Sequence, residues 1–403
     1  MYHDCKDEGI GISWIRKDLY TMSKTDNILM VIGLGELGGI TLEILARISN
    51  ISKIVAADIN EDHGVRRTNT ALMGATYLNL YPDIKFVRID LKNTKETAKI
   101  IQEVNPKIIY CATTLQSWWV IDALPKDVHV QLYKDFCGLG PWIPMHLLLV
   151  HKLMQAVKKS GTNPIVINSS FPDNVNPVLG KIGLAPNVGI GNIDLIVAPW
   201  RKVVSEILNI PLRRVQVYIF GHHYSSYNLG RTGTGLSAPY YLKIMVEDKD
   251  VTENFNIQDL AKEIPVRAKR VPGGQINWIV TSSVVKVILG ILNDTNELSH
   301  APGPEGLIGG YPVYLNKDGA KVFIPEGMTR EKAIKINEEA QKWDGIEKIK
   351  KDGTVVFTDI AYNTFKELLD YDCKELKVDE IENRAKELGT KFKDFARKHG
   401  VKI

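Results

Sequence analysis

An apolar segment that leads into regularly spaced glycines is the feature that most constrains the fold of this chain. Residues 28–38 read Ile-Leu-Met-Val-Ile-Gly-Leu-Gly-Glu-Leu-Gly, a strand-like run followed by the pattern Gly-x-Gly-x-x-Gly. A helix-like stretch comes next, and a second apolar segment, residues 54–57, ends in Asp58. A strand before the glycines, a helix after them and an acidic residue about 20 positions further on match the fingerprint of a dinucleotide-binding unit.

Each position of this fingerprint has a physical task. Gly33 permits the tight turn, Gly35 lets the backbone approach a pyrophosphate, and Gly38 lets the helix pack closely on the strand. The free N–H groups of that helix face the anion. The predicted cofactor-binding residues are Gly33, Gly35, Glu36, Leu37, Gly38, Asp58 and Thr113.

The acidic residue indicates which dinucleotide is bound. Asp58 is expected to accept hydrogen bonds from the ribose 2′- and 3′-hydroxyls, and its carboxylate repels a 2′-phosphate. The sequence therefore favours NAD over NADP. Arg66 and Arg67 lie close enough in sequence to leave NADP open as an alternative.

Composition indicates a globular chain with room for more than one core. The chain has 403 residues, 44% of them hydrophobic, and 51 basic and 47 acidic residues give a net charge of only +4, so nothing suggests a nucleic-acid surface. No apolar run approaches the ~18 residues of a membrane span. Scattered cysteines without Cys-x-x-Cys spacing argue against disulfides and structural zinc and for a cytoplasmic protein; they are Cys5, Cys111, Cys137 and Cys373.

The order of segments predicts a polar N-terminal arm and two domains. Residues 1–25 form the arm, and strand-like and helix-like runs alternate over residues 26–168, which predicts a doubly wound parallel α/β (Rossmann) sheet. Residues 169–403 read as an α+β substrate domain. The long connection 113–144 follows the fourth strand, where the strand order reverses, so it is a candidate lid or substrate wall.

Four segments, taken in order, resemble the malate/lactate dehydrogenase superfamily. Residues 165–168 are similar to the strand that leads to the family's Asn-Pro-Val motif, and residues 183–194 to its stretch ending in Asn/Thr-x-Leu-Asp. Residues 217–223, Val-Tyr-Ile-Phe-Gly-His-His, resemble the strand and turn that carry the catalytic Gly-x-His. Residues 309–319 resemble the family's Gly-x-Pro-Val-x-Leu-Gly-x-x-Gly strand and turn.

The resemblance implies an NAD(P)-dependent oxidoreductase that acts on a small molecule, with a homo-oligomer, dimer or tetramer, expected. Hydride transfer at a carbon bearing oxygen requires a proton transfer beside it. By resemblance His223 is that acid/base, with His222 as the alternative, and Asp194 accepts from its other ring nitrogen. Asn168 or Ser170 is expected to bond the substrate oxygen or the nicotinamide carboxamide. The paired histidines lack spaced acidic or cysteine partners, so no metal is expected.

The sequence departs from the family where the substrate carboxylate is normally held by arginines. The loop at 113–144 contains no arginine, and the position three residues after Asp194 is Val197. Arg201 reaches the site only if the helix carries a local insertion. Arg231 is the best remaining anion holder, and its alternative is a solvated loop charge.

Tryptophans in the long loop offer two interpretations. Trp118 and Trp119, together with Trp142, either line a pocket for a larger, more apolar substrate or pack within the lid. We therefore expect interconversion of an alcohol (or amine) and a carbonyl on a substrate other than a simple small 2-keto acid. The alternatives are an NAD-binding sensor or structural protein that has lost catalysis, and an NAD-using glycosidase-like enzyme.

Overall fold

The structure is a computed structural model of the whole chain. It describes residues 27–49, 51, 53–235, 237–271 and 273–402, so the predicted N-terminal arm, residues 1–25, lies outside the described residues. Within the described part of the chain, every helix is too short or too polar to cross a lipid bilayer.

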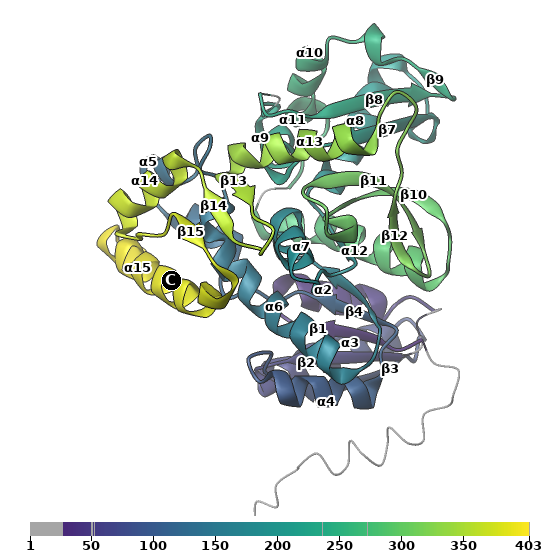
Figure 1. Cartoon of the computed structure of the whole chain (residues 1–403). Coiled ribbons are helices and arrows are strands. Elements are labelled where there is room, and N and C mark those ends of the chain that lie inside the picture. Colours follow the sequence, from purple (N-terminus) through teal and green to yellow (C-terminus); the bar gives the residue numbers. More distant parts are fainter. Residues whose placement is uncertain (1–26, 50, 52, 236, 272, 403) are drawn as a thin grey trace, which may run out of the picture.

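A six-stranded parallel sheet forms the base of the molecule (Figure 1). Its order is β3-β2-β1-β4-β5-β6, so the direction of winding reverses between β1 and β4, which pair directly. The predicted doubly wound α/β fold is thereby confirmed. A short sixth strand extends the sheet beyond residue 168, where we predicted the domain to end. The strands are β1 (Leu29–Ile32), β2 (Lys53–Asp58), β3 (Asp83–Arg88), β4 (Ile108–Cys111), β5 (Ile165–Asn168) and β6 (Val188–Gly189).

Helices cover both faces of this sheet, which explains why β1 and β4 are apolar throughout. Successive strand residues point to opposite faces. Met30 and Ile32 enter one core with helices α4 (Thr94–Val104), α6 (Ile143–Ser160) and α15 (Ile381–Lys398). Leu29 and Val31 enter a second core with α2 (Glu36–Leu45), α3 (Glu61–Thr76) and α12 (Ile276–Leu292).

Above the carboxyl ends of the strands, the chain builds two small antiparallel sheets. The first, β7-β8-β9, packs with α8 and has its own apolar core. The second, β10-β11-β12, packs against α12. The elements are α7 (Pro172–Lys181), α8 (Ile193–Leu208), β7 (Val215–Phe220), α9 (His223–Thr232), β8 (Tyr241–Val246), β9 (Lys249–Asp250), α10 (Ile257–Lys262), α11 (Ile264–Arg267), β10 (Glu297–Pro302), β11 (Gly310–Asn316), β12 (Gly319–Val322) and α13 (Arg330–Ala340).

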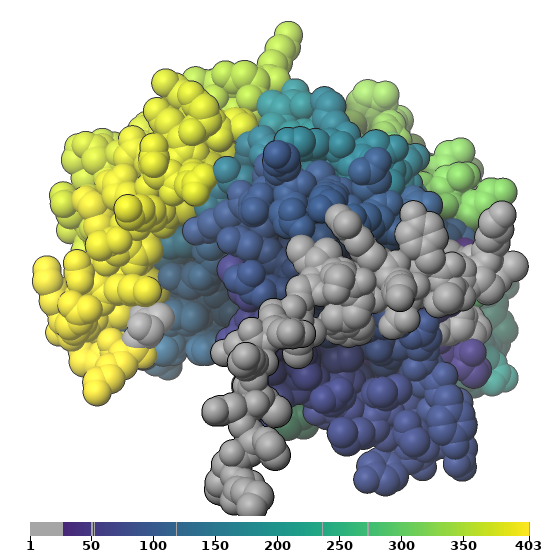
Figure 2. All heavy atoms as spheres, turned by 90° about the horizontal axis from the view of Figure 1, so that it is seen from below, coloured from purple at the N-terminus to yellow at the C-terminus, as the bar shows by residue number. Residues whose placement is uncertain are grey.

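The C-terminal segment returns to the first domain rather than staying with the second. Its last helix, α15, packs on α6, and Figure 2 shows this segment, in yellow, lying against the blue and teal part of the chain. Trp142 is fully buried there, with its ring 5.1 Å from that of Phe365 and 4.7 Å from that of Phe392. Trp142 is therefore a core residue. The segment comprises β13 (Ile346–Ile349), β14 (Val355–Phe357), α14 (Asp359–Leu369), β15 (Glu375–Leu376) and α15, and α5 (Lys126–Leu132) packs against α14.

Candidate active site

A cavity of about 290 Å³ opens at the carboxyl ends of the parallel strands. The turns that follow β1, β4, β5 and β6 form one side of it, and helices α9 and α12 contribute to the rest. This is the place at which a doubly wound sheet binds its ligands, because the strand order reverses there. The predicted residues Gly35, Glu36, Leu37 and Thr113 all line the cavity.

The glycine turn between β1 and α2 has room for an anion. Gly33 has a φ of +91°, and a Cβ on Gly38 would come within 1.8 Å of the Gly33 carbonyl oxygen, so both positions require glycine. A Cβ on Gly35, in contrast, would meet no described atom within 4 Å. Among the described residues, no side chain caps the start of α2. Its first N–H groups are therefore available to a bound phosphate.

Asp58 lies at the end of β2, beside this turn. Its Oδ2 accepts a hydrogen bond from the Leu34 N–H at 2.7 Å, and its Oδ1 accepts from the Asn60 N–H at 2.9 Å. Each carboxylate oxygen keeps a further lone pair for a ligand hydroxyl. The nearby arginines bind acidic residues of the protein: Arg66 pairs with Asp62 at 2.8 Å and Arg67 with Glu43 at 3.0 Å.

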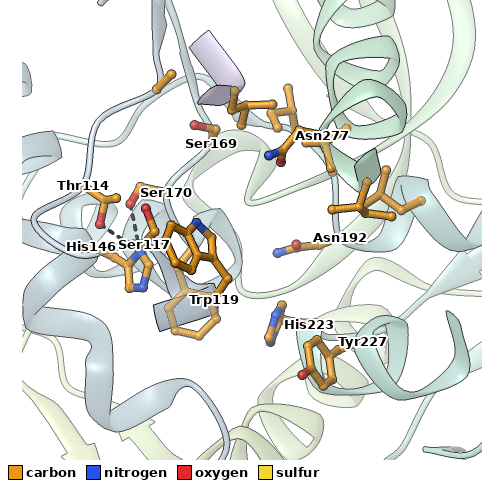
Figure 3. Close-up of a pocket in the computed structure, with 18 of the residues that line it drawn as sticks. Thr114, Ser117, Trp119, His146, Ser169, Ser170, Asn192, His223, Tyr227 and Asn277 are labelled. Atoms are coloured by element: carbon orange, nitrogen blue, oxygen red, sulfur yellow. Dashed lines mark hydrogen bonds between the residues drawn. The ribbon is translucent and has the colours of Figure 1, made fainter. Parts of the chain in front are cut away.

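His223 is the first residue of α9, three positions after the end of β7, and it lines the cavity (Figure 3). The residue is 9% exposed. Nδ1 lies 2.7 Å from Oδ2 of Asp344, a fully buried residue of the 3₁₀ turn Gln341–Asp344. Oδ1 of Asp344 accepts from the Leu139 N–H at 2.8 Å. Both oxygens of the carboxylate are thus held in place. Among the described residues Nε2 of His223 has no hydrogen-bond partner, so it can bind a ligand.

The two groups shift each other's pKa. Burial disfavours the imidazolium, but the charge of Asp344 and its hydrogen bond outweigh burial and raise the pKa of His223. Burial likewise disfavours the carboxylate, and the charge and hydrogen bond of His223 outweigh it and lower the pKa of Asp344. Each group therefore stabilises the charged form of the other.

The expected hydrogen bond between Asp194 and His223 is not formed, and that prediction was wrong. Asp194 lies in the first turn of α8, and its Oδ1 binds Nζ of Lys286 on α12 at 2.5 Å. The carboxylate that holds His223 comes instead from Asp344, in the turn just before the C-terminal segment. His222, the alternative catalytic histidine, is fully buried, with Nε2 2.9 Å from the Asn174 amide nitrogen, so it is His223 that faces the cavity.

Asn168 supports the site without lining it, so the expectation that it contacts substrate or cofactor is corrected. It is fully buried, and its amide donates to the Ser170 carbonyl at 3.1 Å and to Oδ1 of Asn176 at 2.9 Å. Its Oδ1 accepts from the Ser170 N–H at 2.8 Å. The hydroxyl residues that follow it, Ser169 and Ser170, line the cavity in its place.

Of the two arginines proposed to hold the substrate, Arg231 lines the cavity and Arg201 does not. Arg201 donates to the Val215 carbonyl at 2.7 Å and lies away from the cavity, because α8 continues without the insertion that it required. Arg231 does line the cavity. Its guanidinium lies 4.1 Å from the centre of the Tyr227 ring, and Nη2 lies 3.5 Å from Oδ2 of Asp122.

Of the two loop tryptophans, Trp119 lines the cavity and is 51% exposed. The side chain of Trp118 lies outside the described part of the structure. Figure 3 shows Trp119 between the group formed by Thr114, His146 and Ser170 and the opposite wall, which carries Asn192 and His223.

Sequence reasoning missed several residues of the cavity. His146 lies on the largely apolar helix α6, and Nδ1 of its ring is 3.0 Å from Oγ of Ser170. Asn192, whose φ is +46°, precedes α8 and donates to the buried carboxylate of Asp173. A histidine within an apolar helix carries no signal of its own, since most such residues are core residues. Within the described residues, no group of three or more His, Cys, Asp and Glu side chains could hold a metal ion.

Comparison with known proteins places the fold. The sequence matches no protein-family model and no curated protein. A lactate dehydrogenase from Cryptosporidium parvum, complexed with lactic acid and nicotinamide adenine dinucleotide, is similar with a TM-score of 0.55 and 13% identity, over 91% of this chain and 99% of that chain. An Eimeria maxima lactate dehydrogenase with NADH and oxamate is similar with a TM-score of 0.53 and 13% identity, over 80% of this chain and 94% of that chain. A Plasmodium falciparum malate dehydrogenase is similar with a TM-score of 0.53 and 14% identity, over 91% of this chain and 99% of that chain. The chain therefore has the lactate and malate dehydrogenase fold.

Proposed function

We propose that this protein is an NAD-dependent oxidoreductase that interconverts an alcohol and a carbonyl group. The observation that carries the proposal is His223, which is held by the buried Asp344 and lines the same cavity as the glycine turn. A histidine oriented by a buried carboxylate is a suitable acid/base for a reacting oxygen. The shared fold supports a dinucleotide site but says nothing by itself about activity.

The residues of the turn fit the cofactor. The open space beside Gly35 and the free N–H groups of α2 suit a pyrophosphate. Asp58 suits the ribose hydroxyls, and the pairing of Arg66 with Asp62 supports NAD rather than NADP. When bound, the nicotinamide would accept or donate the hydride.

The protein's own residues would handle the proton. In the oxidation of an alcohol, Nε2 of neutral His223 takes the hydroxyl proton, and in reduction the imidazolium returns it. Asp344 holds Nδ1–H and stabilises the imidazolium in both directions. The apolar side chains of Trp119 and Phe171 line the cavity and would limit the entry of water.

The substrate is proposed to be other than a simple small 2-keto acid, as the missing arginines suggest. Arg201 lies away from the cavity, and Arg231 is stacked on Tyr227 beside Asp122. A cytoplasmic location and a homo-oligomeric assembly stay predictions from the sequence.

Calorimetric titration with NAD, NADP, NADH and NADPH tests the first step, and absorbance at 340 nm then follows turnover of alcohols and carbonyl compounds. We expect tight binding of NAD(H), turnover by the native protein, and loss of turnover but not of binding in His223→Asn. Binding without turnover of any substrate class would favour an NAD sensor. Failure to bind any of the four dinucleotides would overturn the proposal.

A further inference from the structure

A polar wall lies across the cavity from His223 and has no place in the acid/base chemistry described above. Three elements converge on it: Thr114 follows β4, His146 belongs to α6 and Ser170 follows β5 (Figure 3). Nδ1 of His146 lies 3.0 Å from Oγ of Ser170 and 3.4 Å from Oγ1 of Thr114. His146 and Ser170 are each only 5% exposed, and both line the cavity.

The backbone of Ser170 is held in place by hydrogen bonds to the side chain of Asn168. Both the N–H and the carbonyl of Ser170 are bonded to the side chain of Asn168, at 2.8 and 3.1 Å. Asn168 is itself held by Asn176. A hydroxyl on a backbone clamped in this way is preorganised for a ligand, because little freedom is lost when the ligand binds.

The wall offers hydrogen bonds without charge. Burial, with a smaller contribution from the nearby His223, lowers the pKa of His146 to about 4, so its imidazole is neutral at neutral pH. Among the described residues, Nε2 of this ring forms no hydrogen bond. If Nδ1 accepts from Ser170, Nε2 carries the ring proton; if Nδ1–H donates, the hydroxyl proton of Ser170 is available. Either tautomer leaves a neutral donor for a ligand.

A carboxylate would be poorly stabilised at this wall. A buried anion needs a cation or several charge-assisted donors to offset its desolvation. Arg231 belongs to α9, the helix that begins with His223, and its guanidinium already lies over the Tyr227 ring and 3.5 Å from Oδ2 of Asp122. Arg270 donates to the Gly230 carbonyl at 2.8 Å, on the same side of the cavity as Arg231.

We infer that the substrate carries an uncharged oxygen on the carbon next to the one that is oxidised, and that Ser170 and His146 bind this oxygen. Vicinal diols, hydroxy ketones and hydroxy amides have this arrangement, whereas 2-hydroxy acids present a carboxylate there. The inference rests on the proposed function, since it takes His223 to hold the reacting oxygen. It adds the chemical class of the substrate to that function.

Matched probes test the inference, because they differ only in the group at issue. One set is mandelate, mandelamide and 1-phenyl-1,2-ethanediol, whose phenyl ring suits a cavity that Trp119 and Phe171 help to line. The other is lactate, lactamide and 1,2-propanediol. We expect the native protein with NAD to oxidise neutral members with a kcat/KM at least about tenfold above that of the matching acid, the factor expected of one well-placed hydrogen bond.

Variants test whether Ser170 and His146 cause the preference for neutral probes over the matching acids. Ser170→Ala and His146→Phe should each raise KM for the neutral probes about tenfold or more, change kcat less, and abolish the preference. His146→Gln, which keeps a neutral hydrogen-bonding group, should retain part of it. Ser226→Ala is the control, because its hydroxyl lines the same cavity but donates to the His223 carbonyl at 2.9 Å. This variant should keep the preference.

Faster turnover of mandelate or lactate than of their neutral partners would overturn the inference and leave the proposed function intact. Absence of NAD binding would overturn the proposed function instead. In that case calorimetric titration of the cofactor-free protein with the same probes still tests the inference, since it requires a neutral probe to bind more tightly than the matching acid. Binding of no probe, with or without NADH, would contradict the inference.

Discussion

Nδ1 of His223 lies 2.7 Å from Oδ2 of Asp344, although 121 positions separate the two residues in the chain. The contact joins the start of α9 to the turn at which the C-terminal segment begins. Asp344 is fully buried, so its charge is stabilised by the imidazolium and by the Leu139 N–H rather than by water. The C-terminal segment is thus expected to be part of the active site.

Replacement of Asp344 by Asn should abolish most of the activity. Loss of the carboxylate removes the group that orients His223 and stabilises its protonated form, so kcat/KM should fall about 100- to 10,000-fold. Breaking a buried pair should also lower the free energy of unfolding by about 3–5 kcal/mol. Initial rates and urea denaturation measure the two effects. NAD affinity should change little.

The matched control is Asp194→Asn. This carboxylate pairs with Lys286, whose side chain is 37% exposed, so its removal should affect stability modestly and leave the orientation of His223 intact. If Asp194→Asn lost more activity than Asp344→Asn, the assignment of Asp344 as the orienting residue would be wrong.

The pH dependence of the reaction should follow His223, whose pKa is raised above its ordinary value of 6.5 by Asp344 in spite of burial. Oxidation requires the neutral imidazole, so its kcat/KM should rise as the pH rises through this pKa. Reduction requires the imidazolium, so its kcat/KM should fall over the same range. Rate profiles in both directions should share a midpoint above 6.5, and residual activity of Asp344→Asn should show a lower midpoint. A midpoint below 6.5 in the native protein would contradict this assignment.

Two glycines of the turn should respond differently to substitution by alanine. A Cβ on Gly38 would overlap the Gly33 carbonyl oxygen, so Gly38→Ala should lower the free energy of unfolding by about 1–3 kcal/mol or more. A Cβ on Gly35 meets open space, so Gly35→Ala should fold normally. Its methyl group would enter the space assigned to the pyrophosphate, and NAD affinity should fall about tenfold or more. Thermal unfolding and calorimetry separate the two effects; unchanged affinity in Gly35→Ala would place the cofactor elsewhere.

Acid should destabilise the protein through His300. Nε2 of this buried ring accepts from the Ile219 N–H at 3.2 Å, and burial lowers the pKa of His300 to about 3. Between pH 6.5 and 3, His300 is protonated in the unfolded chain but neutral in the folded one. The free energy of unfolding therefore decreases as the pH falls through this range. From pH 7.5 to 4.5 this residue should contribute a loss of about 2–3 kcal/mol.

Urea denaturation of His300→Gln at these two pH values should show a smaller acid-induced loss than in the native protein. A glutamine oxygen can accept from Ile219 without titrating in this range. The exposed His399 provides the control, since His399→Gln should leave the loss unchanged. Equal acid sensitivity of His300→Gln and the native protein would exclude this mechanism.

The sequence predicted the parts of the site that depend on neighbouring residues. The turn at Gly33 and the close approach at Gly38 are properties of a few consecutive positions, and Asp58 follows from the alternation of strand and helix. Position at the carboxyl end of a strand likewise placed Thr113 on the cavity. Asp194 was assigned to His223 by family order alone, and the order of residues cannot show that its carboxylate points toward Lys286.

The sequence by itself determined the doubly wound sheet and the glycine turn, because strand and helix periodicity and backbone sterics act over short stretches of chain. Only the tertiary structure decided which carboxylate meets His223 and which groups face it. Asp344 reaches the site because the C-terminal segment packs back on α6. His146 joins Ser170 because α6 packs beside the turn after β5. Such contacts depend on the packing of whole elements, and nothing in the local sequence around these residues encodes their partners.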